Sequence, residues 1–178
     1  MARIAPLMLA PPAIFVVIAG LFGFGMLRED PDALPSARAG QQAPPVNLTP
    51  LGDFATFSDK ELRSGGVKLV NYWASWCAPC RAEHRFLDQL QDEGVTLYGI
   101  NYKDDPIKAV AFLDELSNPY SALGADESGR TALDWGLYGV PETYVLAADG
   151  TVILRFAGPI TQSILESTIR PALRDAAQ

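Results

Sequence analysis

Short apolar runs alternate along the chain with segments of helical spacing. The runs at 67–74 and 95–102 are rich in β-branched and aromatic residues, as expected of strands buried on both faces. Helical spacing follows each run, at 77–93 and again from the helix start Asp104-Asp105-Pro106 to about residue 116. Gly94 is a typical stop signal for the first of these helices. The pattern therefore predicts a β–α–β–α order in this half of the chain.

The pattern beyond residue 120 predicts two more helices and a hairpin. A short helix is expected at 129–137, and strands at 144–147 and 152–156 flank the turn dipeptide Asp149-Gly150. A last helix over 161–173 has its apolar residues on one side, and Pro171 should kink its end. These residues are Ile160, Ile164, Leu165, Ile169 and Leu173. The complete order indicates an α/β fold in which helices cover both faces of a mixed sheet.

The first thirty residues differ from the rest. Residues 7–27 contain no charged side chain, and a helix of that length spans about 31 Å, close to the thickness of a bilayer core. Arg3 before this run favours a cytoplasmic N-terminus and an exported remainder. We therefore expect a cytoplasmic segment at 1–6, a transmembrane signal-anchor helix at 7–27, a Pro-rich flexible linker at 28–42 and a folded domain at 43–178.

A cleaved signal peptide is the alternative to an anchor. Ala37-Arg38-Ala39 offers a cleavage site of the small-x-small type, but it lies ten residues beyond the apolar run. That distance exceeds the usual arrangement in signal peptides. Under both interpretations the folded domain leaves the cytoplasm.

Composition excludes several classes of protein. The 178 residues are 48% hydrophobic and 20% charged, so the chain can bury a core and global disorder is excluded. A net charge of −7 without a basic run argues against nucleic acid as a partner. Two cysteines allow one disulfide at most, which excludes a disulfide-stapled scaffold. With the single histidine, they are too few for a structural zinc site with four Cys or His ligands.

The candidate chemistry is concentrated in the segment Trp76-Cys77-Ala78-Pro79-Cys80. Two cysteines at this spacing can close a disulfide across the first turn of the predicted helix. Unpaired N–H groups and the positive dipole end of that helix favour a thiolate at Cys77, the better nucleophile. Cys80 is then placed to attack a mixed disulfide and to release the partner as a dithiol. A structural disulfide, which stabilises little across so short a loop, and a metal-binding pair are the other interpretations.

A carboxylate follows the cysteine pair at helical spacing. Glu83, Leu87 and Leu90 come 3, 7 and 10 residues after Cys80 and form one helical stripe. Because the leucines should face the sheet, Glu83 should be drawn toward the buried side, where burial raises the pKa of its carboxyl. It would then suit a proton shuttle for the Cys80 thiol; the alternative is a carboxylate that faces solvent. His84, one position on, is expected to be an exposed helix residue.

A second motif, at 138–143, stands just before the predicted hairpin. Its proline, Pro141, must mark a turn or a strand start, because proline is excluded from central strands. Residues 71–84, Asn-Tyr-Trp-Ala-Ser-Trp-Cys-Ala-Pro-Cys-Arg-Ala-Glu-His, taken with Tyr-Gly-Val-Pro-Glu-Thr at 138–143, resemble thioredoxin-fold proteins of the CcmG/DsbE group. These are membrane-anchored periplasmic thiol:disulfide oxidoreductases of cytochrome c maturation. The resemblance covers about residues 40–175. Trp-Cys-x-x-Cys identifies only the thioredoxin superfamily, and the two longer motifs narrow it to this group.

The resemblance implies roles for residues around the cysteine pair. Cys77 and Cys80 would form the redox-active disulfide, with Cys77 attacking and Cys80 resolving. Pro141 matches the family's cis-proline, which lies beside the pair and helps to bind the partner's chain together with Val140. Trp76 is expected to line the same site.

The resemblance also implies roles for two carboxylates. Glu142 would add to an acidic active-site surface, and Glu83 matches an acidic residue that tunes the cysteine pair. Asn71 takes the place of the buried aspartate of cytoplasmic thioredoxins, which makes Glu83 the better proton acceptor. Trp73 is expected in the core. The region from 126 to 135 resembles the insert that is characteristic of the CcmG/DsbE group, but no individual residue in it can be matched.

The implied reaction is reduction of a disulfide in apocytochrome c, at a Cys-x-x-Cys-His haem site, directly or through another maturation protein. A membrane electron donor of the DsbD/CcdA type would reset the enzyme. We expect a monomer in the periplasm, held at the bacterial inner membrane, without a metal or cofactor of its own.

Two alternatives remain from the sequence. One is an envelope thiol:disulfide oxidoreductase of the same superfamily that acts on other substrates. The other is a copper-delivery protein that binds Cu(I), which favours thiolates, through Cys77, Cys80 and His84. The chain lacks the further distal histidine that copper-delivery families of this kind carry.

Overall fold

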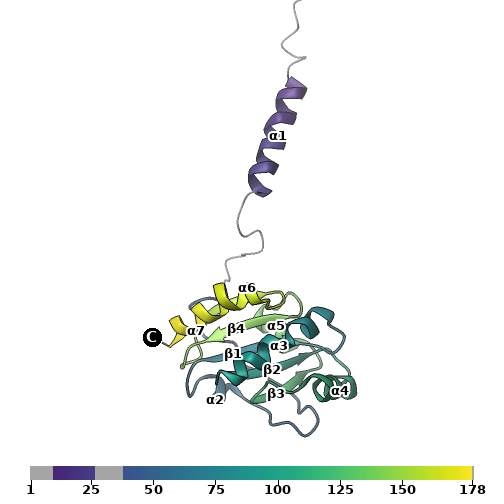
Figure 1. Cartoon of the computed structure of the whole chain (residues 1–178), viewed down its shortest axis with the longest axis vertical. Helices are drawn as coiled ribbons and strands as arrows, with labels where there is room; N and C mark the ends of the chain where they lie inside the picture. The colour runs from purple at the N-terminus through teal and green to yellow at the C-terminus, as the bar shows by residue number, and fades with distance from the viewer. Residues whose placement is uncertain (1–9, 27–37, 178) are drawn as a thin grey trace, which may run out of the picture. The chain divides into compact units, whose positions relative to one another are not determined.

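The computed structural model of the chain describes residues 10–26 and 38–177 (Figure 1). They belong to two compact units. The N-terminal unit contains α1 (Ala10–Met26), whose large apolar side chains at 14–18 and 21 are exposed. No helix within the described ranges has the length and apolar character needed to cross a bilayer. Residues 1–9 and 27–37, which include parts of the expected anchor, linker and cleavage site, lie outside the described residues.

The second unit is built on a mixed sheet with the strand order β3-β2-β1-β4-β5. Its strands are β1 (Lys68–Trp73), β2 (Thr96–Tyr102), β3 (Ala122–Asp126), β4 (Glu142–Leu146) and β5 (Val152–Ala157). The central strand β1 pairs in parallel with β2 and antiparallel with β4. All of its residues are buried, as the uninterrupted apolar run predicts. The four strands expected from the sequence are confirmed to within two residues.

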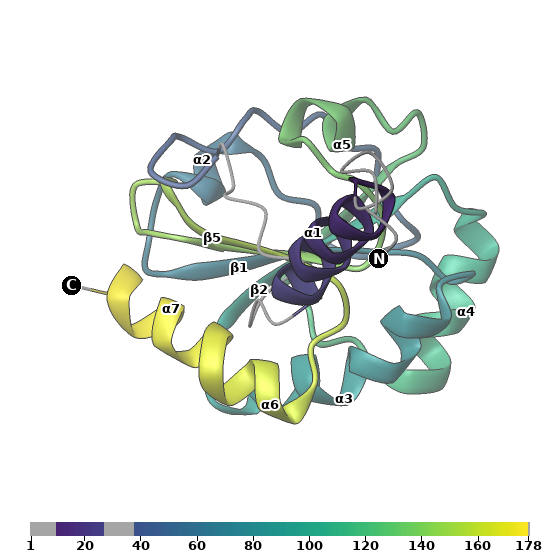
Figure 2. The ribbon, with the colours of Figure 1, turned by 90° about the horizontal axis from the view of Figure 1, so that it is seen from above.

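Helices cover both faces of this sheet. They are α2 (Asp59–Leu62), α3 (Ala78–Asp92), α4 (Pro106–Leu116), α5 (Arg130–Trp135), α6 (Gln162–Ile164) and α7 (Arg170–Ala176). The crossovers β1-α3-β2 and β2-α4-β3 advance in the same direction across the sheet. Because such crossovers are right-handed, α3 and α4 lie on one face. Figure 2 shows α6 and α7 on that side as well, with α2 and α5 opposite. The predicted thioredoxin-like α/β fold is confirmed.

Alternate residues of β1 separate two cores. Leu69 and Trp73 pack in the core beneath α3, α4 and the C-terminal helices, which confirms the buried position expected for Trp73. Val70 and Tyr72 face the opposite core, together with Trp135 of α5. The polar residue Asn71 lies between Leu69 and Trp73 on the face of β1 that α3 covers. Its side chain belongs to the candidate active site.

The C-terminal helix departs from regular α geometry. Residues 165–169 form a π-helical turn between α6 and α7, so the helical run extends from 162 to 176 instead of 161–173. Pro171 explains the departure, because its nitrogen cannot donate a hydrogen bond and its ring crowds the carbonyl four residues earlier. A wider turn relieves that crowding within a continuous helix.

Strand β3 was not expected from the sequence. Its residues, Ala-Leu-Gly-Ala-Asp, include types that are depleted in strands. Tertiary contacts stabilise it: β3 pairs in parallel with β2, and Thr49 bridges to Ala125 on its outer side. A Cβ atom at Gly124 would lie 2.8 Å from Cβ of Leu48. The strand therefore needs a glycine where the N-terminal segment crosses it.

The folded unit begins earlier than the expected boundary at residue 43. The backbone N–H of Gly40 donates to Val152 O at 2.8 Å, and the N–H of Val152 donates to Gln41 O at 2.8 Å. Gln42 forms a bridge with Thr151. Residues 40–42, assigned to the linker from their composition, therefore pair with the β4–β5 hairpin, because its edge offers unpaired backbone groups.

Candidate active site

The two cysteines lie where β1 ends and α3 begins. Cys77 is the N-cap residue of α3, and its Sγ accepts a hydrogen bond from the backbone N–H of Cys80 at 3.1 Å. The two residues form a disulfide with a Cα–Cα distance of 5.3 Å. Both cysteines are buried. The N–H of Cys80, which has no partner within the helix, thus points at the Cys77 sulfur. This arrangement stabilises a thiolate after reduction.

The loop before Cys77 is fixed by the end of β2. The N–H and Oγ of Ser75 donate to the Asp104 carboxylate at 2.5 and 2.7 Å, and Nδ2 of Asn101 donates to it at 2.9 Å. Nε1 of Trp76 donates to Lys103 O at 3.2 Å, while its side chain is 59% exposed. Asp104 was identified in the sequence only as part of a helix start. Its place just after a strand parallel to β1 was the available signal for this role.

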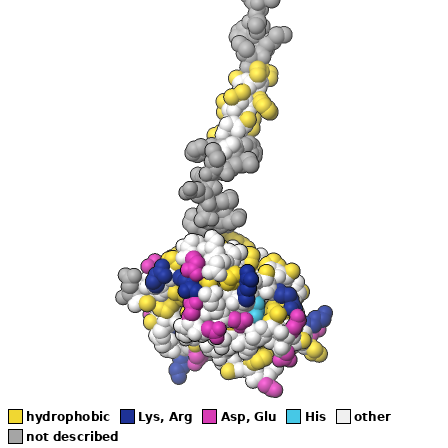
Figure 3. Space-filling view, viewed as in Figure 1, with side chains coloured by type: hydrophobic (Ala, Val, Ile, Leu, Met, Phe, Trp, Pro, Cys, Tyr) yellow, Lys and Arg dark blue, Asp and Glu magenta, His cyan; other side chains and the backbone are white. Residues whose placement is uncertain are grey.

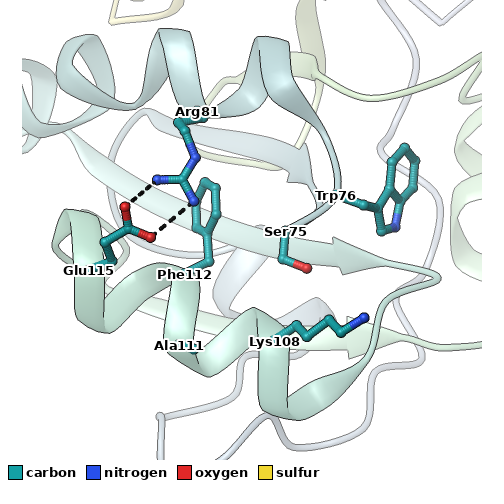
Figure 4. Close-up of a pocket in the computed structure, with 7 residues that line it drawn as sticks. All are labelled: Ser75, Trp76, Arg81, Lys108, Ala111, Phe112 and Glu115. Atoms are coloured by element: carbon teal, nitrogen blue, oxygen red, sulfur yellow. Dashed lines mark hydrogen bonds and ion pairs between the residues drawn. The ribbon is translucent and has the colours of Figure 1, made fainter.

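Trp76 also borders a pocket of about 370 Å³ between α4 and the start of α3 (Figure 4). Arg81 donates to both oxygens of Glu115, at 2.8 and 3.1 Å, and lies over the Phe112 ring. The remaining lining residues are Ser75, Lys108 and Ala111. Trp76 thus lies beside both the cysteines and this pocket, and its role in binding a partner stays a prediction.

Glu83 is completely buried, as the helical stripe predicts. Its Oε1 accepts a hydrogen bond from Nδ2 of Asn71 at 2.9 Å, and its Oε2 accepts one from the N–H of Ile160 at 2.8 Å. Burial raises the pKa of the Glu83 carboxyl to about 7, although both hydrogen bonds oppose the increase. The alternative of a solvent-facing carboxylate is therefore wrong. At neutral pH the group can both accept and release a proton.

The second motif forms the turn into β4. The peptide bond between Val140 and Pro141 is cis, as the resemblance implies. Pro141 is buried, Val140 is partly buried, and Pro141 O accepts a hydrogen bond from the N–H of Gly158 at 2.9 Å. Val140 packs against both hydrophobic cores. The turn is therefore held by the sheet at one end and by the core at the other.

Glu142 does not add to an acidic surface, because it is only 1% exposed. Arg155 on β5 donates to both of its oxygens, at 2.8 and 3.1 Å, and the N–H of Tyr138 donates to it at 2.7 Å. Arg155 reaches it because β4 and β5 are paired antiparallel. Glu142 thus holds the turn before Pro141. On the face of the second unit shown in Figure 3, acidic side chains lie among basic ones.

His84 is not exposed, contrary to expectation. Only 3% of its surface is accessible, because α4 covers the flank of α3 that carries it. Its Nε2 lies 3.1 Å from Ser117 O, its ring packs edge-on against Phe112, and burial lowers its pKa. Among the described residues no group of three or more His, Cys, Asp or Glu side chains could hold a metal ion. The copper hypothesis therefore gains no support from His84.

Comparison with known proteins agrees with this site. The sequence pattern of the family described as Redoxin matches residues 38–173, most of the chain. The chain belongs to the redoxin family. It is 46% identical to the thiol:disulfide interchange protein HelX of Rhodobacter capsulatus, over 97% of this chain and 98% of that protein. It is 38% identical to the thiol:disulfide interchange protein DsbE of Escherichia coli, over 92% and 91% of the two chains.

A solved structure of a similar protein shares the fold. A secreted thiol-disulfide isomerase from Corynebacterium glutamicum superposes with a TM-score of 0.63 at 25% identity, over 75% of this chain and 86% of that one. Family membership and the Cys77–Cys80 disulfide together identify the chain as a thiol:disulfide oxidoreductase of the DsbE and HelX type.

The raised pKa of Glu83 predicts a pH-dependent stability. The folded oxidised protein keeps a proton on Glu83 that the unfolded chain loses near pH 4.5, the ordinary pKa of the group. This contribution is complete below that pH and is lost as pH rises through about 7, which corresponds to about 3 kcal/mol. In the wild-type protein the free energy of unfolding should therefore decline as pH rises, and in Glu83→Gln this decline should be absent. Urea titrations of the oxidised protein between pH 4 and 8 measure both.

The matched control is Glu166→Gln, since Glu166 is an exposed carboxylate on the C-terminal helical run. This variant should retain the decline of the wild-type protein. An identical decline in Glu83→Gln would contradict the assignment of the pH dependence to the buried carboxyl.

Proposed function

We propose that this protein is a periplasmic reductant that breaks disulfides during cytochrome c maturation. Its substrate would be the Cys-x-x-Cys-His segment of apocytochrome c or a maturation protein that carries the same disulfide. The observation that carries the proposal is a helix-capping cysteine pair followed, one turn later, by a fully buried carboxyl. The motifs at 71–84 and 138–143 support the choice of substrate.

In the first step Cys77 attacks the partner. The Cys77 thiolate, stabilised by the start of α3, attacks one sulfur of the partner's disulfide. A bond forms between the two sulfurs, the partner's own S–S bond breaks, and its second sulfur leaves as a thiolate that takes up a proton from water.

In the second step Cys80 releases the partner. Glu83 accepts the proton of the Cys80 thiol, and the resulting thiolate attacks Sγ of Cys77. The Cys77–Cys80 disulfide forms and the bond between Cys77 and the partner breaks. The released partner sulfur takes up a proton from water, so the partner leaves as a dithiol. Two electrons pass from the protein to the partner, and Glu83 later returns its proton to solvent. A membrane donor of the DsbD/CcdA type would then reduce the disulfide again.

The surface around Cys77 provides places for the partner's chain. Trp76 is largely exposed, and Val140 is partly exposed just before the cis-proline. An extended segment that crosses Pro141 would meet both side chains. Glu142 contributes indirectly, since its bonds to Arg155 and to the N–H of Tyr138 hold this turn. We take the acting unit to be a monomer, since these groups all come from one chain.

We further propose that residues 7–27 anchor the protein in the inner membrane. The segment has no charged residue, and consecutive large apolar side chains of α1 are exposed, so all sides of the helix are apolar. The full chain should sediment with membranes after a high-salt wash, whereas a chain lacking residues 1–37 should be released. Release of the protein by salt alone would contradict an anchor, and a shortened N-terminus on the released protein would favour a cleaved signal.

The substrate proposal predicts a specific trapped complex. In Cys80→Ser the mixed disulfide at Cys77 should persist, because its resolving thiol is absent. Mass spectrometry of disulfide-linked complexes from cells that make c-type cytochromes should identify apocytochrome c or a maturation protein. Cys77→Ser, which lacks the attacking thiol, is the control and should yield neither. If the trapped proteins were only other envelope proteins, the alternative of a reductase with different substrates would hold.

The direction of electron flow predicts the reduction potential. A reductant supplied by a membrane donor should have a potential near or below about −200 mV, the range in which glutaredoxins and thioredoxin lie. Equilibration of the full chain with defined ratios of reduced and oxidised thiol buffers measures it. A value near about −120 mV, that of DsbA, would indicate an oxidant and would contradict the proposed function.

A further inference from the structure

We propose that Tyr120 is a positioning residue for the redox reaction: through Asn71 it fixes the hydrogen-bond donor that faces Glu83. The inference rests on the proposed role of Glu83 as the proton acceptor of Cys80. Tyr120 lies between α4 and β3 and was not noticed in the sequence. Its hydroxyl donates to Oδ1 of Asn71 at 2.8 Å, inside the core.

A continuous hydrogen-bond chain joins Tyr120 to Glu83. Nδ2 of Asn71 donates to Oε1 of Glu83 at 2.9 Å and to Oγ1 of Thr143 at 3.2 Å. The other carboxyl oxygen accepts from the N–H of Ile160. All four side chains are buried. The amide of Asn71 is therefore the only side-chain donor to Glu83 among the described residues.

The orientation of this amide decides which form of the carboxyl is stabilised. In the observed orientation Asn71 donates to Glu83, which favours the carboxylate. Turned by half a rotation, Asn71 would present its oxygen to Glu83, and only a protonated carboxyl could donate to it. The same rotation would turn the amide nitrogen toward Tyr120. The hydroxyl hydrogen of Tyr120, which has no second acceptor among the described residues, would then be left unpaired, which is unfavourable for a buried donor.

The protein makes room for Tyr120 in an unusual way. Gly99 stands in the interior of β2, directly opposite Asn71 in the register of β1 and β2. A Cβ atom there would lie 2.9 Å from the Tyr120 ring. Trp73 stacks on the same ring, with centroids 5.9 Å apart. Glycine weakens a strand interior. Its presence at position 99 is explained if the Tyr120 ring must lie against the sheet to reach Asn71.

Few groups besides Asn71 can affect the protonation of the Glu83 carboxyl. Asn71 from β1 and the N–H of Ile160 before α6 donate to its oxygens, and Thr143 from β4 and Tyr120 contact Asn71. Cys80 lies one turn earlier on α3. Within the described part of the chain, no charged side chain forms a hydrogen bond or ion pair with this carboxyl. Loss of the Tyr120 hydroxyl should therefore favour the protonated carboxyl and delay proton transfer from Cys80 to a higher pH.

The test is Tyr120→Phe in the full chain, with Tyr72→Phe as the matched control. The Tyr72 hydroxyl is also buried, on the opposite face of β1, but forms no hydrogen bond within the described residues. Reduced protein is mixed with the aromatic disulfide 5,5′-dithiobis(2-nitrobenzoate). The first thionitrobenzoate released reports attack by Cys77, and the second reports attack by Cys80 on the mixed disulfide.

In Tyr120→Phe the pH profile of the second release should move upward, so that below its midpoint the release is about three- to tenfold slower. The first release should not change, and Tyr72→Phe should match the wild-type protein in both. Gly99→Ala, which displaces the ring, should shift the second release in the same direction and serves if Tyr120→Phe fails to fold. If Glu83→Gln slows the second release but Tyr120→Phe and Tyr72→Phe show equal second releases, the inference is overturned.

Infrared titration of the oxidised protein separates this inference from the proposed function. The protonated carboxyl band that disappears in Glu83→Gln should persist to higher pH in Tyr120→Phe. If that band does not move, Tyr120 does not position the site. If the band moves but Glu83→Gln leaves the second release unchanged, the positioning stands and the proposed role of Glu83 falls.

Discussion

A carboxyl group buried beside a redox disulfide must have hydrogen-bond donors, because an unpaired buried charge costs several kcal/mol or more. Glu83 obtains them from two places distant in sequence, Asn71 on the central strand and the backbone before α6. These bonds tie α3, which carries both cysteines, to the sheet and to the C-terminal segment. The position of the cysteine pair relative to the sheet and the C-terminal segment thus depends on how one carboxyl is satisfied.

The site contains a second buried carboxyl in a contrasting environment. Glu142 meets the guanidinium of Arg155, whereas the polar contacts recorded for Glu83 are with neutral groups. Burial among neutral groups favours the protonated form of Glu83. Glu142 therefore suits a fixed structural role in the turn before Pro141, and Glu83 suits the proposed proton exchange with Cys80. The neighbours of each glutamate thus determine which of the two roles it suits.

The sequence pattern predicted the parts of the fold in which the local residues themselves favour the observed secondary structure. The apolar runs gave β1 and β2, the Asp-Pro start and Gly94 bounded helices, and the stripe from Cys80 to Leu90 placed Glu83 inside. It failed where packing overrides local preference. Strand β3 is made of poor strand formers held by pairing, and the flank of α3 with His84 is covered by a helix that the periodicity of α3 does not reveal.

By itself, the sequence determined the chemistry available at the site: two cysteines at the start of a helix, a carboxyl one turn behind them, and a proline turn before the hairpin. Only the tertiary structure decided what each carboxyl meets. Tyr120 reaches Asn71 across 49 positions of sequence, and Arg155 reaches Glu142 across 13. Such pairs depend on strand register and on how the elements pack, neither of which is written in the periodicity of one segment.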